Sequence, residues 1–321
     1  MSARPCPDCD RVPRRRFLQA TAAISAVPIL VPMVHGAPSR SSQAESVVAE
    51  LYESFNENQK KEVCRSFGDP LRQKVDANWH VTKPLIGSDF YTKSQQGMIE
   101  KIVQSLTSDE GYRRLKQQMD EDDGGLDAYS IAIFGQPQQR EFEWVLTGRH
   151  LTLRADGDTV PKTAFGGGIV YGHGEESSPE ANLFYFQTKA VNEVFKSLDK
   201  DQRSRALITS TPPSETDIEI RGSSGKFAGI AASEFSRDQM ELFRTSLATL
   251  LGPYRDEDAD EAMRIMESGG GLGELRLAFY QQEDLGNDSV WDIWRIEGPN
   301  SVIHFRGAPH VHAYIHIVQA T

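Results

Sequence analysis

Four short segments that share one pattern constrain the fold of this chain more than any other feature of its sequence. In each, a large apolar residue precedes a short polar residue, and a glutamine stands three positions after the polar one. The polar residue and its glutamine are Asn56 and Gln59, Thr92 and Gln95, Asp199 and Gln202, and Ser236 and Gln239. The short side chain can accept a hydrogen bond from a first-turn amide, while the glutamine reaches back to the amide of the polar residue. The pattern therefore predicts four helix starts, each followed by an amphipathic helix.

The spacing of these and other landmarks indicates an internal duplication. Four pairs of matching positions are 143, 144, 146 and 150 residues apart: Asn56 and Asp199, Thr92 and Ser236, Gly124 and Gly270, and Trp144 and Trp294. A slow increase in the offset is what short loop insertions would produce. We therefore predict two similar repeats, residues 38–188 and 189–321, joined in one globular unit.

Each predicted repeat has a helical segment followed by strands. The expected strands are Ser130–Phe134, Phe142–Thr147, His150–Arg154, Arg276–Tyr280, Asp292–Glu297, Ser301–Phe305 and His310–His316. Because helices and strands do not alternate strictly, the sequence predicts an α+β fold rather than a doubly wound sheet.

Residues 1–37 have the pattern of an export signal. Three arginines, Arg14–Arg16, precede Phe17-Leu18 and a weakly apolar run, Ala20–Val34, which small residues follow. Adjacent arginines before such a run are typical of the twin-arginine type. We expect export by the twin-arginine machinery to the periplasm or the extracellular space, with no stable membrane insertion after the signal is cleaved. Cleavage would leave Cys64 as the only cysteine, so no internal disulfide is expected.

The charge of the chain excludes some classes of partner. The formal net charge is −11, and five of the arginines lie in the expected signal, so the exported chain is more acidic still. Such a surface disfavours nucleic acids and anionic membranes. A small-molecule substrate or ligand is the expected partner.

The positions of the histidines indicate a metal-binding site. Four of the eight lie in the last eighteen residues, and His310 and His312 form a His-x-His pair on an expected strand, which places both rings on one face. His150 and His173 occupy comparable places in the first repeat. We predict that these four bind Zn, Cu or Fe between the repeats, because imidazole is the commonest ligand for such metals.

We expect different roles for other charged residues and histidines. Arg149 and Arg306 are candidate catalytic residues that could orient an anionic substrate or polarise a carbonyl, although pairing with local acids explains them equally well. His80 and His316 are expected to be structural, and His304 stays undecided. The expected hydrogen-bonding carboxylates are Asp288, Asp292 and Glu297, whereas Asp120–Asp123 is interpreted as a solvated helix end.

The chain resembles the bacterial secreted proteins catalogued as domain of unknown function 3500. The resemblance rests on Leu106–Tyr112, Ser130–Pro137, Gly148–Leu151, Glu297–Pro299 and His310–His312. The chain differs from the family pattern at Arg149, where a second histidine is usual, and at His304, where an acidic residue is usual. The resemblance implies fold and export but no reaction.

Three functions remain open from the sequence. The first is an exported metalloprotein, either a hydrolase with zinc or an oxidoreductase with copper or iron. The second is a non-catalytic exported binding protein in which the histidines are structural. The third is a metal-free enzyme that uses a histidine with a carboxylate for acid–base catalysis.

Overall fold

The computed structural model describes residues 36–320 except 138, 140 and 287, so the predicted export signal lies outside the described residues up to position 35. Eleven strands of the described chain form one mixed sheet, in the order β1-β2-β3-β4-β5-β11-β10-β9-β8-β6, with β7 paired to β8. The strands are β1 Cys64–Arg65, β2 Ser130–Gly135, β3 Phe142–Gly148, β4 Leu151–Ala155, β5 Ile169–His173, β6 Leu207–Ile208, β7 Ile230–Ala231, β8 Arg276–Tyr280, β9 Ile293–Gly298, β10 Ser301–Arg306 and β11 Val311–Ile317. The seven strands expected from the sequence are confirmed, with small shifts at their ends.

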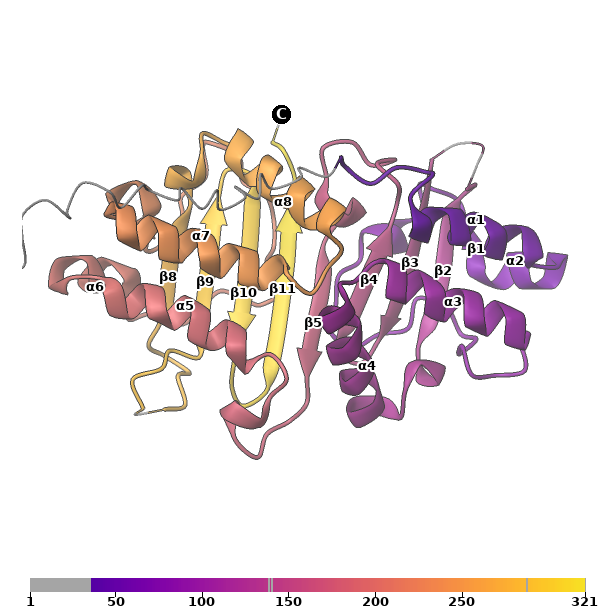
Figure 1. Ribbon diagram of the computed structural model, residues 1–321, viewed down its shortest axis with the longest axis horizontal. Coiled ribbons are helices and arrows are strands. Elements are labelled where there is room, and N and C mark those ends of the chain that lie inside the picture. The colour runs from indigo at the N-terminus through magenta and orange to yellow at the C-terminus, as the bar shows by residue number, and fades with distance from the viewer. Residues whose placement is uncertain (1–35, 138, 140, 287, 321) are drawn as a thin grey trace, which may run out of the picture. The chain divides into compact units, whose positions relative to one another are not determined.

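The α-helices lie on one side of this sheet in Figure 1. They are α1 Gln43–Ser54, α2 Glu57–Val63, α3 Lys93–Ser105, α4 Asp109–Asp123, α5 Tyr185–Ser197, α6 Lys200–Ala206, α7 Arg237–Leu251 and α8 Asp256–Ser268. The α+β class and the single globular unit are therefore confirmed for the described chain. Within it, no helix is both long and apolar enough to cross a membrane.

All four predicted capping boxes are present, at the starts of α2, α3, α6 and α7. Their glutamines also pair with one another. The Gln59 Nε2 donates to the Gln95 Oε1 at 2.9 Å, and the Gln202 Nε2 donates to the Gln239 Oε1 at 3.1 Å. Each glutamine therefore fixes its own helix start and ties it to a second helix.

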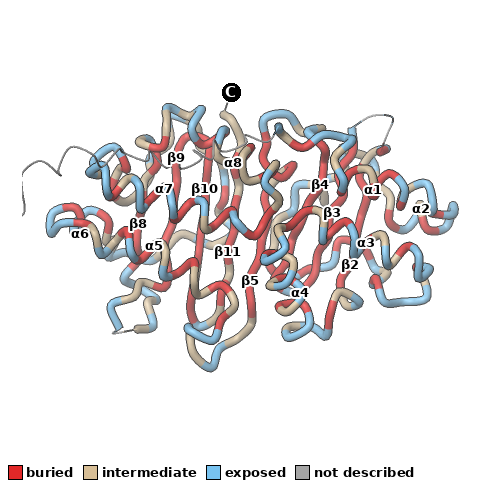
Figure 2. Tube along the Cα trace, viewed as in Figure 1, coloured by how far each residue is buried: buried red, intermediate tan, exposed pale blue. Residues whose placement is uncertain are grey.

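The strands are buried on both faces. Ile131 and Ile133 belong to the main core beneath the helices, whereas Ala132 and Phe134 pack with Trp79 on the opposite face. Figure 2 shows the strands buried along their length and the outer sides of the helices exposed. The opposite face is covered by two long connections, one before α3 and one before α7, which contribute Ala77 and Ile218 to a second small core. Double coverage explains why the strands lack a strict polar–apolar alternation.

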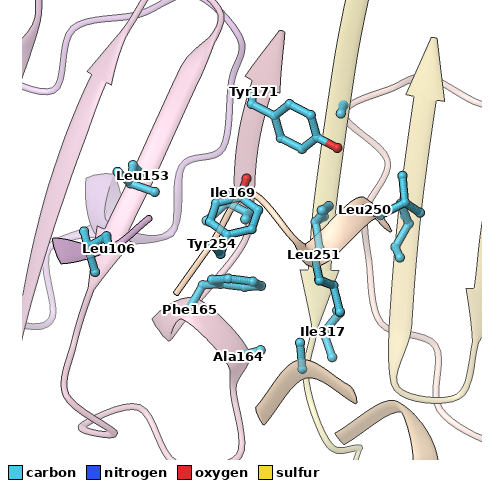
Figure 3. Close-up of a cluster of buried hydrophobic side chains, with 14 of the residues drawn as sticks. Leu106, Leu153, Ala164, Phe165, Ile169, Tyr171, Leu250, Leu251, Tyr254 and Ile317 are labelled. Atoms are coloured by element: carbon cyan, nitrogen blue, oxygen red, sulfur yellow. The ribbon is translucent and has the colours of Figure 1, made fainter. Parts of the chain in front are cut away.

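The two halves of the sheet meet where β5 pairs antiparallel with β11. Beneath the helices, Tyr254 lies against Phe165 and Tyr171, with ring centroids 4.8 and 6.3 Å apart (Figure 3). The turn after α3 also pairs with the turn after α7 through the bridge between Thr107 and Tyr254. This seam is therefore an apolar core on its helical side, and the candidate site lies at one end of it.

Candidate metal centre

The His-x-His pair behaves as its spacing predicts. Strand β11 turns Val311 and Ala313 into the main core, so His312 lies on the face opposite the helices. His310 immediately precedes the strand, and the two ring centroids are 4.7 Å apart. The Nε2 atoms of the two rings lie 3.1 Å from each other.

His150 joins this pair from the first half of the sheet. With Arg149 it forms the connection between β3 and β4, and its backbone has a positive φ of 56°. Its ring centroid lies 4.9 Å from that of His312 and 5.2 Å from that of His310. The absence of a side chain at Gly172 lets β5 and His150 approach β11 closely. A Cβ at that position would lie 2.3 Å from the Val311 carbonyl oxygen and 3.3 Å from the His150 Cβ.

The Nδ1 atom of each of the three imidazoles is hydrogen-bonded to a carboxylate oxygen. The distances are 2.7 Å from His150 to Asp122, 2.8 Å from His310 to Glu176 and 2.8 Å from His312 to Glu215. An ionised carboxylate can only accept, so we assign the proton to Nδ1 and the lone pair to Nε2 in every ring. This is the arrangement by which proteins orient histidine ligands toward a metal.

The surroundings favour the ionised form of Asp122 and Glu215 and the neutral form of the His310 and His312 rings. Burial opposes the ionisation of Asp122, but hydrogen bonds from His150, Gln118 and Gly174 outweigh it and lower its pKa. Burial opposes the ionisation of Glu215 too, and the hydrogen bond and charge of His312 reverse that effect and lower its pKa. Burial, with the charge of Arg306, lowers the pKa values of His310 and His312.

The chemistry of the donors fits a transition metal. One ligand atom from each of His150, His310 and His312 lies within 4.8 Å of the others. Two ligand nitrogens of a tetrahedral zinc ion, each about 2.0 Å from the metal, are separated by about 3.3 Å. The 3.1 Å separation of the His310 and His312 Nε2 atoms is close to that value. The three histidines together could therefore hold a metal ion.

The two candidate arginines lie at this cluster. The Arg306 Nη2 is 3.5 Å from the His310 Nε2, and its Nε is 3.6 Å from a Glu215 oxygen, beyond hydrogen-bond length. Arg149 precedes His150, and a Cβ at Gly174 would lie 3.4 Å from its Nη2. Gly174 itself donates its backbone N–H to Asp122 at 2.8 Å.

His173, the fourth ligand expected from the sequence, does not belong to the group of three. Its Nε2 is 2.7 Å from the Glu121 carboxylate, and its Nδ1 accepts from the Leu183 backbone amide at 3.3 Å. Across the ladder it is opposite Val311, so its side chain leaves the sheet on the helical face. His150 and His173 are thus held by consecutive acids of α4 but face different surroundings.

The remaining histidines of the described chain have other surroundings. The His80 Nε2 contacts the Ala128 carbonyl at 3.1 Å, and the His316 Nδ1 donates to the Ile218 carbonyl at 2.8 Å. Both were expected to be structural. His304 is buried on the same face as His312, since it is opposite Tyr314 in the ladder.

Sequence reasoning missed the acids of the site. Asp122 was interpreted as part of a solvated helix end, which is wrong, because its side chain is 4% exposed and accepts from His150. The three acids nominated instead have other partners: Asp292 accepts from Leu285, Asp288 from Val290 and Glu297 from Arg295. Glu176 and Glu215 lie in connections without any pattern of their own, so only the fold brings them to the histidines.

A cavity of about 560 Å³ lies elsewhere on the same face of the sheet. It is lined by Arg154, the glycine run Gly166–Gly168 and His316, among others, and not by the three clustered histidines. The cavity and the histidine cluster are therefore separate features of this face.

Comparison with known proteins gives a family and no activity. Neither a search of curated proteins nor a search of solved structures found a match. A family model described as a protein of unknown function, DUF3500, matches residues 38–319, nearly all of the described chain. The chain belongs to the DUF3500 family.

Proposed function

We propose that the protein is an exported metalloenzyme in which His150, His310 and His312 bind one divalent transition metal ion, Zn, Cu or Fe. The observation that carries the proposal is the carboxylate on every Nδ1 atom, which leaves three Nε2 atoms for the metal. Zinc bound there would supply Lewis-acid chemistry for a hydrolase, and copper or iron would supply redox chemistry for an oxidoreductase. Three protein ligands leave a position for substrate, as in catalytic rather than structural zinc sites.

The substrate in this proposal is a small anion. Arg306 supports it, because its guanidinium lies 3.5 Å from a ligand nitrogen and would repel a bare metal cation there. An anionic group bound to both would offset that repulsion. Arg149 would act on the same group from the first half of the sheet.

We also infer the duplication and the export route. The order of helices and strands before β5 matches the order before β11, and both halves contain the same pair of linked capping boxes. The predicted boundary between the repeats, at residue 188, falls inside helix α5, Tyr185–Ser197. The order of helices and strands therefore favours a junction before α5. Export to the periplasm or beyond rests on the twin-arginine pattern of residues 1–37.

Elemental analysis tests the metal. The protein would be purified after native export without a histidine tag, and we expect about one equivalent of Zn, Cu or Fe. His310→Ala and His312→Ala should lose the metal and stay folded, whereas His316→Ala, on the same strand as His312, should keep it. His173→Ala should also keep it if the ligand set is the group of three. Failure of the wild-type protein to hold any of these metals, even after reconstitution, would refute the proposal.

Metal-free acid–base catalysis is the second candidate, and the same hydrogen bonds favour it. A histidine whose Nδ1 donates to a buried carboxylate is oriented to act as a general base through Nε2. This alternative predicts activity that survives removal of all metal by a chelator. The metalloenzyme predicts loss of activity and its return on reconstitution.

A further inference from the structure

A second polar pair lies on the same face of the sheet, beside the histidine cluster. Arg295 on β9 and His304 on β10 are directly opposite each other in the antiparallel ladder, so their side chains leave the sheet on the same face. Arg295 is 0% exposed and His304 is 3% exposed. Two polar side chains are therefore packed together out of contact with bulk water.

Three nitrogen atoms of this pair have no hydrogen-bond partner among the described residues: Nε and Nη1 of Arg295 and Nδ1 of His304. The remaining guanidinium nitrogen, Nη2, donates to the Asp217 carbonyl at 2.7 Å and to the Glu297 carboxylate at 3.0 Å. A buried charged group with unmatched N–H donors is costly, so such groups in folded proteins have partners.

The nearby carboxylates also have other partners. The Glu297 oxygen that accepts from Arg295 also contacts Arg221, at 3.4 Å. Glu215 is engaged by His312 at 2.8 Å and pairs with Arg306 at 3.6 Å. The protein around Arg295 therefore provides fewer acceptors than the guanidinium requires.

The first half of the sheet provides an internal comparison. Arg154 on β4 is another buried arginine, 2% exposed, on the face opposite the helices. Its Nε donates to the Gly168 carbonyl, its Nη1 to the Arg72 carbonyl and its Nη2 to the Lys74 carbonyl, and Glu143 neutralises its charge. This fold thus gives every nitrogen of a buried guanidinium an acceptor where the surrounding segments supply them.

We propose that a small monovalent anion, a halide ion or a carboxylate of the size of formate, binds between Arg295 and His304. An anion accepts hydrogen bonds from a guanidinium more strongly than water does, because the contact is charge-assisted. The segment Asp217–Arg221 contacts Arg295 and Glu297. Because Arg295 and His304 are both buried, only a small ion would fit between them. The site is independent of the proposed metal.

The state of His304 is consistent with a donor role. Burial, followed by the charge of Arg295, lowers the pKa of His304 to about 3, so the ring is neutral near pH 7. A neutral imidazole carries one N–H, and placing it on Nδ1 gives the unpartnered atom an acceptor in the bound anion.

Thermal unfolding tests the site. The midpoint would be measured in increasing sodium bromide, chloride or formate, with sodium gluconate holding the ionic strength constant, because gluconate is too large for a buried site. We expect a saturating rise of about 3 °C in the wild type. His304→Glu places a tethered carboxylate beside Arg295, so its midpoint in gluconate should equal that of the bromide-saturated wild type and should not respond to bromide. Arg244→Gln, which breaks an exposed ion pair with Glu267, should respond as the wild type does.

Anomalous diffraction from bromide-soaked crystals gives a second readout that does not require the variant to fold. A peak between Arg295 and His304 supports the proposal, and the formate arm then shows whether carboxylates also bind. The proposal is overturned by an unresponsive wild type, by an equal response in His304→Glu, or by bromide found only at exposed positions, an adventitious ion only.

Discussion

Asp122→Asn tests whether the carboxylates control the metal centre. One oxygen of Asp122 accepts from His150 at 2.7 Å and from Gln118 at 2.8 Å, and the other accepts from the Gly174 amide at 2.8 Å. An asparagine amide has one acceptor and one donor end, so it cannot serve all three. If its oxygen faces His150, its NH₂ group meets the Gly174 N–H. If its NH₂ group faces His150, the imidazole proton must move to Nε2, the atom that would bind the metal.

Either orientation loses at least one charge-assisted hydrogen bond, which is worth about 1.5–3 kcal/mol. Loss of such a partner typically weakens metal binding by about 10–100-fold. A chromophoric chelator that competes for Zn²⁺ measures this ratio directly.

Glu121→Gln is the matched control. Glu121 is the preceding residue of the same helix, and it bonds His173 at 2.7 Å, outside the group of three. We expect the zinc affinity of Glu121→Gln to stay within about 3-fold of wild type, well below the change expected at Asp122. Equal losses in the two variants would refute the reasoning, since His173 would then contribute as much as His150. An unchanged affinity in Asp122→Asn would refute it too.

Further predictions concern the scaffold. In Gly172→Ala the new Cβ would lie 2.3 Å from the Val311 carbonyl oxygen, so the free energy of unfolding in urea should fall by more than about 2 kcal/mol and the metal content should fall too. In Gly97→Ala, in α3, the new Cβ has nothing within 4 Å, so the free energy of unfolding should rise by about 0.5–1 kcal/mol. Gln59→Ala and Gln202→Ala remove matching sets of hydrogen bonds and should each cost about 2–3 kcal/mol; values more than about 1 kcal/mol apart would contradict their equivalence. Burial, then the charges of Asp258 and Asp156, raises the pKa of Glu261 to about 8. A carboxyl with a raised pKa stabilises the fold at low pH and loses that contribution as the pH rises to about 8. Glu261→Gln should thus remove on the order of 1 kcal/mol of the stability lost between pH 5 and pH 8, and an unchanged slope would argue against it.

The sequence predicted those parts of the fold that have local causes. Capping boxes such as Asn56 with Gln59 depend on four consecutive residues, so they can be recognised without a fold. Strand β5, Ile169–His173, was not predicted, because it directly follows a glycine run and has no polar–apolar alternation. It is central in the sheet, and its pairing with β11 joins the two halves.

The candidate site was predictable only in part for the same reason. The His310 and His312 side chains meet because two residues separate them on a strand. The proximity of His150 to them follows from the β5–β11 pairing, which the sequence indicated only through the proposed duplication. Glu176 and Glu215 reach the site from irregular connections, and their positions depend on tertiary packing alone.

In the proposed duplication, matching positions lie at the two ends of the central seam, and the residues at these positions differ. Gly148 matches Gly298 in the sequence, so Asn300 is the counterpart of His150. The Asn300 amide donates to the Ile265 carbonyl at 2.9 Å, and its oxygen accepts from the Ala320 amide at 2.9 Å, so it closes the fold at its end of the seam. At the other end the matching turn position carries the imidazole of His150, which lies beside His310, just before β11, and His312, on β11. Stability requires hydrogen bonds such as those of Asn300, whereas three available nitrogens on one spot contribute nothing to folding by themselves. That difference between the turns at Asn300 and His150 supports the proposal that His150, His310 and His312 have a functional rather than a structural role.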